Sequence, residues 1–124
     1  MTKEQITAMF DANYGRLKSD PEEIGLGAFD ETIWDARAFF LNVCEILNGV
    51  GLTDAPLPVI GPAGKGSIDF HWKQDKFELL INYSMEGNID FYADNYKDSK
   101  IQGCCTKEVF FSILNMWRGR IECN

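Results

Sequence analysis

The residues best suited to acid–base chemistry in this chain are its single histidine and the carboxylates that follow it. His71, Glu78 and Tyr92 stand in three neighbouring segments in which apolar and polar residues alternate. A histidine held by a carboxylate can exchange protons near neutral pH. The chain carries no nucleophile-elbow motif and no zinc-protease motif. We therefore expect a non-enzymatic protein, and a ligand-binding domain or motif-less enzyme with a site near these three residues is the alternative.

The four cysteines, Cys44, Cys104, Cys105 and Cys123, predict free thiols rather than disulfides or a metal site. Cys104 and Cys105 are adjacent, and neighbouring cysteines rarely meet the geometry of a bridge. A zinc site needs pairs of cysteine or histidine ligands at short spacing, which this sequence lacks. We expect no metal and no cofactor. The start of the chain has no signal-peptide pattern and no apolar run is long enough to span a membrane, so a cytoplasmic protein is expected.

The charge balance of the chain disfavours some partners and favours others. The 124 residues include 19 acidic and 12 basic side chains, for a net charge of −7. Direct nucleic-acid binding is not expected, because gripping a phosphate backbone requires a basic surface. The expected partner is a basic protein, since opposite charge speeds association. The acids are dense between residues 18 and 35, where Glu22, Glu23, Asp30 and Glu31 are candidate partner-binding residues. The alternative is a solvated loop followed by acids that complement a helix dipole.

The first half of the chain is expected to be helical. Apolar residues recur at helical spacing over residues 2–17, and Thr2 with Gln5 forms a capping-box pattern. A second helix is expected to begin at Asp30, whose carboxylate would cap it, and to run to residue 47. Residues 52–66 contain three prolines and three glycines, so we expect an ordered but irregular connector there.

The second half of the chain changes to a period of two residues. Strict alternation of apolar and polar side chains predicts strands over residues 67–73, 77–83 and 89–94, and a weaker fourth strand over 99–104. Thr106 is the expected N-cap of a C-terminal helix. The apolar stripe of that helix consists of Phe110, Ile113, Leu114, Trp117 and Ile121.

Turn length determines the expected pairing of these strands. A two-residue turn between the first two strands would place Trp72 opposite Phe77. A three-residue loop with a left-handed Gly87 between the next two would place Ile81 opposite Phe91. Both pairings keep the apolar side chains on one face, which is the condition that selects a register.

The residues between the apolar ones define a second, polar face of the sheet. The expected register places three rows across it, namely His71–Glu78–Asp94, Asp69–Leu80–Tyr92 and Ser67–Asn82–Asp90. An apolar centre of Leu80 and Tyr92 within a ring of acids is typical of a protein interface. The alternative is a solvated face on which Lys73 and His71 relieve repulsion between acids. The candidate partner-binding residues here are Asp69, Glu78, Leu80, Asp90, Tyr92 and Asp94, and a second copy of the chain is another candidate occupant.

These patterns predict an α+β fold with two N-terminal helices, a three- to four-stranded antiparallel meander and a C-terminal helix packed on one sheet face. Residues 1–124 are expected to form a single domain, with a helical half (1–51), a connector (52–66) and a sheet with the last helix (67–124). The expected function is that of a small acidic protein that inhibits, neutralises or scaffolds a larger basic or nucleic-acid-binding protein. Immunity proteins, antitoxins, phage-encoded anti-defence inhibitors and accessory subunits fit these physical terms.

Overall fold

A five-stranded antiparallel sheet with helices packed on one of its faces makes up the fold of the computed structural model, which describes residues 2–19, 27–48 and 58–122. The strands lie across the sheet in chain order, so each strand pairs with its sequence neighbours. The elements are, in order, α1 (Lys3–Asp11), α2 (Tyr14–Lys18), α3 (Asp30–Asn48), β1 (Val59–Pro62), β2 (Ile68–Lys73), β3 (Glu78–Tyr83), β4 (Asn88–Asp94), β5 (Lys100–Thr106) and α4 (Lys107–Glu122). The predicted α+β class is confirmed, and the sheet has one strand more than the sequence indicated.

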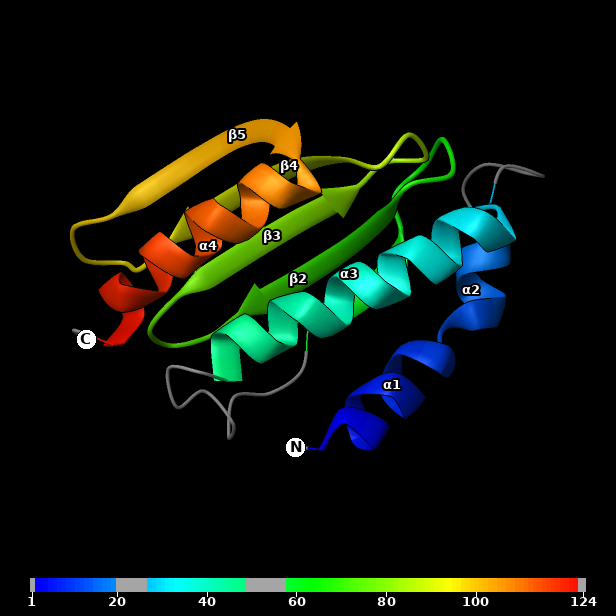
Figure 1. Cartoon of the computed structure of the whole chain (residues 1–124), viewed down its shortest axis with the longest axis horizontal. Helices are drawn as coiled ribbons and strands as arrows, with labels where there is room; N and C mark the ends of the chain where they lie inside the picture. The colour runs from blue at the N-terminus through cyan, green and yellow to red at the C-terminus, as the bar shows by residue number, and fades with distance from the viewer. Residues whose placement is uncertain (1, 20–26, 49–57, 123–124) are drawn as a thin grey trace.

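The helices cover one face of the sheet (Figure 1). α3 and α4 lie side by side over the strands, and α1 packs next to α3. Aromatic rings fill the space between the two layers. Phe40 of α3 stacks on Phe70 of β2 with ring centroids 5.0 Å apart, and Phe110 of α4 lies 5.3 Å from Phe91 of β4. The buried side chains of helices and sheet form one cluster, so the burial of apolar area holds the layers together.

The N-terminal segment begins as the sequence predicts and then departs from it. Thr2 accepts the backbone N–H of Gln5, and the Gln5 side chain accepts the backbone N–H of Thr2, which confirms the capping box. The single helix expected over residues 2–17 is divided between α1 and α2. Asn13 lies at the break, and its side chain donates to the carbonyl of Met9 at 3.0 Å. An asparagine that bonds to nearby backbone competes with helical hydrogen bonding, which explains the interruption.

The connector expected over residues 52–66 contains a strand that the sequence did not predict. β1 occupies part of this range and pairs with β2, so that Pro62 lies opposite Ile68. Residues 52–57 lie outside the described residues. Pro62 has no backbone N–H to donate, but β1 is an edge strand with a neighbour on one side only. Proline is tolerated in such an edge strand. The sequence did not predict the strand because prolines are frequent in residues 52–66 and are typical of irregular segments.

The β3–β4 hairpin has the predicted register. Ile81 lies opposite Phe91, and the backbone N–H of Ser84 donates to the carbonyl of Asn88 at 3.0 Å. Gly87 closes the loop with φ of 84°. A side chain is strained in this left-handed conformation, so glycine is the residue that suits the turn.

The predicted register between β2 and β3 is wrong by two residues. Trp72 lies opposite Leu79 rather than Phe77. The backbone N–H of Gln74 donates to the carbonyl of Phe77 at 2.8 Å, so these two residues face each other and the turn is formed by Asp75 and Lys76 rather than by Gln74 and Asp75. Because the shift is two residues, every side chain stays on its predicted face and only the partners across the strands change.

The last predicted strand and helix are both present, as β5 and α4. Thr106 caps α4 by accepting the backbone N–H of Val109 at 3.3 Å. The predicted stripe faces the core, with Phe110, Leu114, Trp117 and Ile121 buried and Ile113 partly buried. Since α4 joins α3 on the same side, the opposite face of the sheet is left without a helix in the described chain.

Candidate functional site

The uncovered face of the sheet, called the outer face from here on, carries alternate side chains of strands β2 to β5. In Figure 1 the described helices lie in front of the sheet or beside its β1 edge. The outer-face side chains are Asp69, His71, Lys73, Glu78, Leu80, Asn82, Asp90, Tyr92, Asp94, Lys100, Gln102 and Cys104. One face of an antiparallel sheet can contact water, so such a face is free either to stay solvated or to meet a partner.

One end of the outer face is electrically balanced. Glu78 lies opposite Asp94, as predicted, and like charges repel across a strand pair. Lys73 lies opposite Glu78, and Lys100 Nζ is 3.8 Å from Asp94 Oδ2. His71 Nε2 also lies 2.7 Å from Glu78 Oε2. Bases therefore flank both acids, and this end of the face has little net charge.

The other end of the outer face is acidic. Asp69, Asn82, Asp90 and Cys104 form one row across β2 to β5. The neutral side-chain amide of Asn82 donates to Asp69 at 2.9 Å and leaves the charge of that carboxylate in place. A hydrogen bond to the Asp90 carboxylate, followed by burial and the negative charge of Asp90, raises the pKa of the Cys104 thiol. Two carboxylates are thus present in this row, and the described base beside it is Arg16, whose Nη2 would lie 3.3 Å from a Cβ atom added to Gly61, the β1 residue opposite Asp69.

A shallow hollow of about 600 Å³ lies over this acidic end. Its lining consists of Asp69, Leu80, Asn82, Asp90, Phe91, Tyr92, Gln102, Gly103 and Cys104. Leu80 and Tyr92 lie opposite each other and supply apolar surface next to the two carboxylates. The Tyr92 hydroxyl donates to Asp94 Oδ2 at 3.1 Å, and Lys100 Nζ lies 6.0 Å from the centroid of the Tyr92 ring. The Tyr92 ring is therefore held toward the balanced end by its neighbours.

Six of the predicted partner-binding residues lie together on the outer face, namely Asp69, Glu78, Leu80, Asp90, Tyr92 and Asp94. The three predicted rows that contained β2 residues are wrong, because the register shift moves each β2 residue by one row. His71 lies opposite Leu80 instead of Glu78, and Asp69 lies opposite Asn82. The shift brings the acid Asp69 into line with Asp90, and this creates the acidic row.

Strand β5 supplies outer-face residues that sequence reasoning did not assign, Lys100, Gln102 and Cys104. The alternation of apolar and polar residues in β5 is weak, so the sequence did not indicate which side chains share a face. The strict alternation of β4 could have supplied this assignment. Because β5 pairs with β4, residues that lie opposite each other in the two strands point to the same face.

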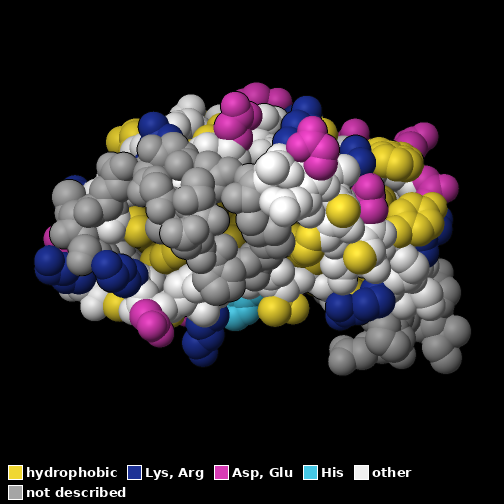
Figure 2. Space-filling view, turned by 90° about the horizontal axis from the view of Figure 1, so that it is seen from below, with side chains coloured by type: hydrophobic (Ala, Val, Ile, Leu, Met, Phe, Trp, Pro, Cys, Tyr) yellow, Lys and Arg dark blue, Asp and Glu magenta, His cyan; other side chains and the backbone are white. Residues whose placement is uncertain are grey.

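The four remaining candidates lie apart from the outer face. Asp30 and Glu31 are exposed at the start of α3, which lies on the opposite side of the sheet. Glu22 and Glu23 lie outside the described residues. Figure 2 shows acidic side chains along its upper edge, where the helical layer faces the solvent, with lysine and arginine side chains among them. A single flat partner surface cannot contact Asp30 and the outer face together.

Asp30 has a tertiary role in place of the predicted capping role. It is the first residue of α3, and the carbonyl of Phe29 accepts the backbone N–H of Ile33. The Asp30 carboxylate accepts the hydroxyl of Tyr14 and lies 3.2 Å from Lys18 Nζ. These contacts, with the Tyr14 hydrogen bond as the largest cause, lower the pKa of Asp30. The carboxylate thus ties α3 to α2.

The candidate acid–base pair is formed, although its third member points elsewhere. His71 contacts Glu78 diagonally across β2 and β3, and Tyr92 lies in the row of His71. The Tyr92 hydroxyl donates to Asp94, so it does not complete a hydrogen-bonded triad with the other two. The lining of the hollow includes neither His71 nor Glu78.

Comparison of the chain with protein-family models, curated proteins and solved structures found no match. None of the helices in the described parts of the chain combines the length and apolar character needed to cross a membrane. Within residues 2–19, 27–48 and 58–122, no group of three or more His, Cys, Asp or Glu side chains is arranged to hold a metal ion.

Proposed function

We propose that this protein binds a basic protein through the outer face of its sheet and acts by contact, as an inhibitor, a neutralising partner or a scaffold. The observation that carries the proposal is the hollow at the acidic end, where Leu80 and Tyr92 lie beside Asp69 and Asp90. Apolar surface bordered by charge is the anatomy of a protein interface. An inhibitor and an accessory subunit both need such a surface, and a nucleic-acid-binding protein is one class of basic partner that fits it.

A lysine or arginine side chain of the partner matches the chemistry of the hollow. Its aliphatic stem would lie on Leu80 and the Tyr92 ring, and its charged head would reach Asp69 or Asp90. The net charge of −7 would add long-range attraction that speeds association and that salt screens. Because bases balance the opposite end of the face, this attraction is directed toward the acidic row.

The test uses two double variants that remove the same amount of charge. Asp69→Asn with Asp90→Asn alters the hollow, whereas Glu4→Gln with Glu45→Gln alters exposed residues of α1 and α3. Wild type and both variants would be used to capture partners from a lysate of the source cells, at low salt and at about 0.15 M salt. Mass spectrometry would quantify each captured protein.

We expect wild type and the helix variant to capture one basic protein in stoichiometric amount. The outer-face variant should bind it at least about tenfold more weakly, because removing one member of a buried charge pair costs about 2 kcal/mol or more. With the purified partner, the association rate should fall as salt rises. Full retention of the partner by the outer-face variant, or an association rate that salt leaves unchanged, would contradict the proposal. If the partner binds nucleic acid, a competition experiment then measures whether this protein displaces the nucleic acid from it.

A small-ligand or catalytic site at His71 and Glu78 is the second candidate, and their 2.7 Å contact is the observation that favours it. The two functions differ in the effect of His71→Ala. A site built on the pair would lose its activity with this variant, whereas the contact function should keep its partner, since the hollow lies on other residues. Partner capture and small-molecule screening with the same variant distinguish the two.

A further inference from the structure

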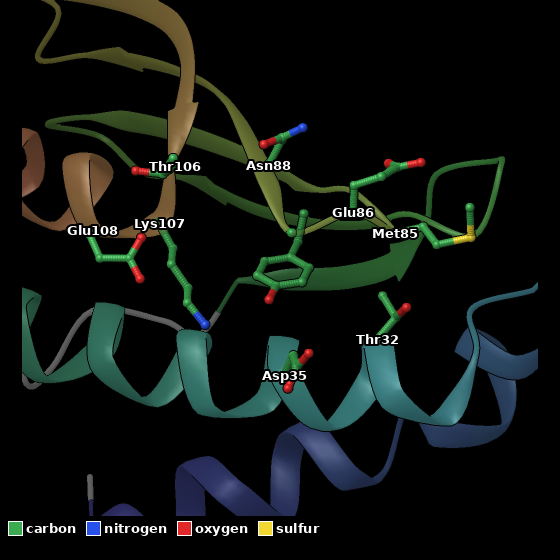
Figure 3. A pocket seen from close by; sticks show the side chains of 10 residues that line it. Thr32, Asp35, Met85, Glu86, Asn88, Thr106, Lys107 and Glu108 are labelled. Atoms are coloured by element: carbon green, nitrogen blue, oxygen red, sulfur yellow. The ribbon is translucent and has the colours of Figure 1, made fainter.

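A second cavity lies between the helical layer and one end of the sheet, away from the outer face (Figure 3). It has a volume of about 280 Å³ and is formed by the first half of α3, the β3–β4 loop and the junction of β5 with α4. This volume is at the lower limit of ligand pockets, roughly 300 Å³. A small group, rather than a nucleotide or a large cofactor, is the occupant that such a space admits.

Two side chains that carry hydroxyl groups, Tyr83 and Thr32, line this cavity. Tyr83 of β3 is 2% exposed and Thr32 of α3 is 6% exposed. Neither hydroxyl has a hydrogen-bond partner among the described residues. A Cβ atom added to Gly87, another lining residue, would stand 3.9 Å from the Tyr83 hydroxyl oxygen, which places that oxygen at the cavity. Among the described residues, the buried side-chain nitrogen or oxygen without a partner is Trp117 Nε1, so the two hydroxyl oxygens are reached from the cavity and are open to a ligand.

The charge around the cavity is negative. Asp35 of α3, Glu86 of the β3–β4 loop and Glu108 of α4 line it, and Lys107 is the one base in the described lining. Figure 3 shows the Lys107 side chain reaching from the start of α4 toward α3, the helix that carries Asp35. Burial raises the pKa of Tyr83, and the charges of Asp35 and Glu108 raise it further. The tyrosine therefore stays protonated, and its oxygen can accept a hydrogen bond from a donor.

We propose that this cavity binds the terminal ammonium group of a small organic amine. An ammonium has three N–H donors and no acceptor, and the cavity offers carboxylates at Asp35 and Glu108 beside the hydroxyls of Thr32 and Tyr83. Charge-assisted hydrogen bonds to carboxylates are the stronger contribution, and the hydroxyl oxygens would take the remaining donors. The site is separate from the outer face, so this inference does not depend on the proposed function.

The first experiment titrates the full chain with three probes of equal length, n-butylammonium, n-butanol and n-butyrate, followed by backbone amide NMR. We expect n-butylammonium to shift the amides of Gly87, Asn88 and Lys107, and the neutral and anionic probes to shift none of them. Blocked lysine amide is a further probe, which shows whether the ammonium of a protein side chain can enter as a free amine does. Equal binding of n-butanol, preference for n-butyrate, or no binding of any amine would overturn the proposal.

The second experiment assigns the site by mutation. Asp35→Asn should weaken n-butylammonium binding about tenfold, since a hydrogen bond to a charged group contributes roughly 1.5 kcal/mol or more. Tyr83→Phe should weaken it several-fold and keeps the ring that packs 5.2 Å from Phe39. Glu45→Gln is the matched control, because it removes the same charge from an exposed position of α3 outside the cavity. If the affinities of Asp35→Asn and Glu45→Gln are equal, binding is non-specific attraction and the assigned site is wrong.

Discussion

His71 Nε2 lies 2.7 Å from Glu78 Oε2, although the strand ladder pairs His71 with Leu80 and Glu78 with Lys73. Long side chains reach diagonal neighbours across an antiparallel pair, which makes this contact compatible with the register. Glu78 therefore has a base directly opposite and another on its diagonal, while Asp94 stands on its other side. The histidine gives Glu78 a hydrogen-bonding partner, and the lysines Lys73 and Lys100 are the cations beside the two acids.

This relationship predicts a small structural effect of His71→Ala. The His71 and Glu78 side chains are 36% and 21% exposed, and ion pairs at such positions contribute at most about 1 kcal/mol. We expect the free energy of unfolding to fall by less than about 1 kcal/mol, measured by urea denaturation. A loss of several times that amount would show that the pair has a structural role beyond charge compensation.

Two glycines predict opposite effects of added side chains. Gly119 lies within α4, and a Cβ atom there would meet no heavy atom within 4 Å, so Gly119→Ala should stabilise the protein by about 0.5–1 kcal/mol. Gly103 of β5 lies against Phe91, whose Cε1 would be 3.3 Å from a Cβ atom. Gly103→Val should therefore destabilise by about 1–3 kcal/mol through overpacking. Thermal unfolding of both variants checks the two signs.

From the contacts of Asp30 we predict that the folded protein loses stability in acid. Its pKa in the folded protein lies below the usual value of about 3.9, chiefly because Tyr14 donates to it and Lys18 is close. A carboxyl of this kind contributes stability above its unfolded pKa, and the contribution disappears as the pH falls through the folded pKa. We expect Asp30→Asn to be less stable than wild type near neutral pH and equal to it at the acid end. A difference that is constant with pH would contradict this assignment.

The thiols should differ in their rates of alkylation. Burial raises the pKa of Cys44 to about 12, so iodoacetamide at about pH 8 should leave it unmodified in the folded protein. Cys104 is exposed and should react, but slowly, because contact with Asp90 raises its pKa. Asp90→Asn should then accelerate the reaction of Cys104, while Asp75→Asn should not. Peptide mass spectrometry over time, in a Cys123→Ser background, measures both rates.

A substitution at Tyr92 tests whether a second copy of the chain occupies the outer face. Tyr92 and Leu80 form the apolar middle of that face, and a lysine there would place charge in the centre of a symmetric contact. If the outer face forms a homodimer, Tyr92→Lys should convert it to a monomer, because an unpaired buried charge is strongly destabilising. Analytical ultracentrifugation gives the mass. An oligomer whose mass is unchanged by this variant must associate through another surface.

Much of the fold was predictable because the signals that specify it are local. Alternation with a period of two marked β2, β3 and β4, and the helical stripe from Phe110 to Ile121 marked α4. β1 was missed because the apolar signal of Val59 and Ile60 is short and stands among prolines and glycines. Only pairing with β2 makes this segment a strand, and pairing is not a local property.

The candidate sites were predictable to different extents. The outer face followed from alternation, since the side chain of every second residue points to the same side of a strand. The acidic row did not follow, because a shift of two residues leaves both faces unchanged and alternation cannot detect it. The hydrogen bond between Gln74 and Phe77 in the β2–β3 loop decides that register.

The sequence by itself therefore determined which residues of β2, β3, β4 and α4 are buried, which face of the sheet is polar, and the negative charge of the molecule. The tertiary structure alone decided that Asp69 aligns with Asp90 and that Thr32 meets Tyr83 at one cavity. The pattern of burial can be predicted from the order of residues along the chain, because each side chain has its own free energy of transfer from water. The proximity of residues far apart in sequence depends on turn geometry and on the packing of helix against sheet, and both arise only when the whole chain folds.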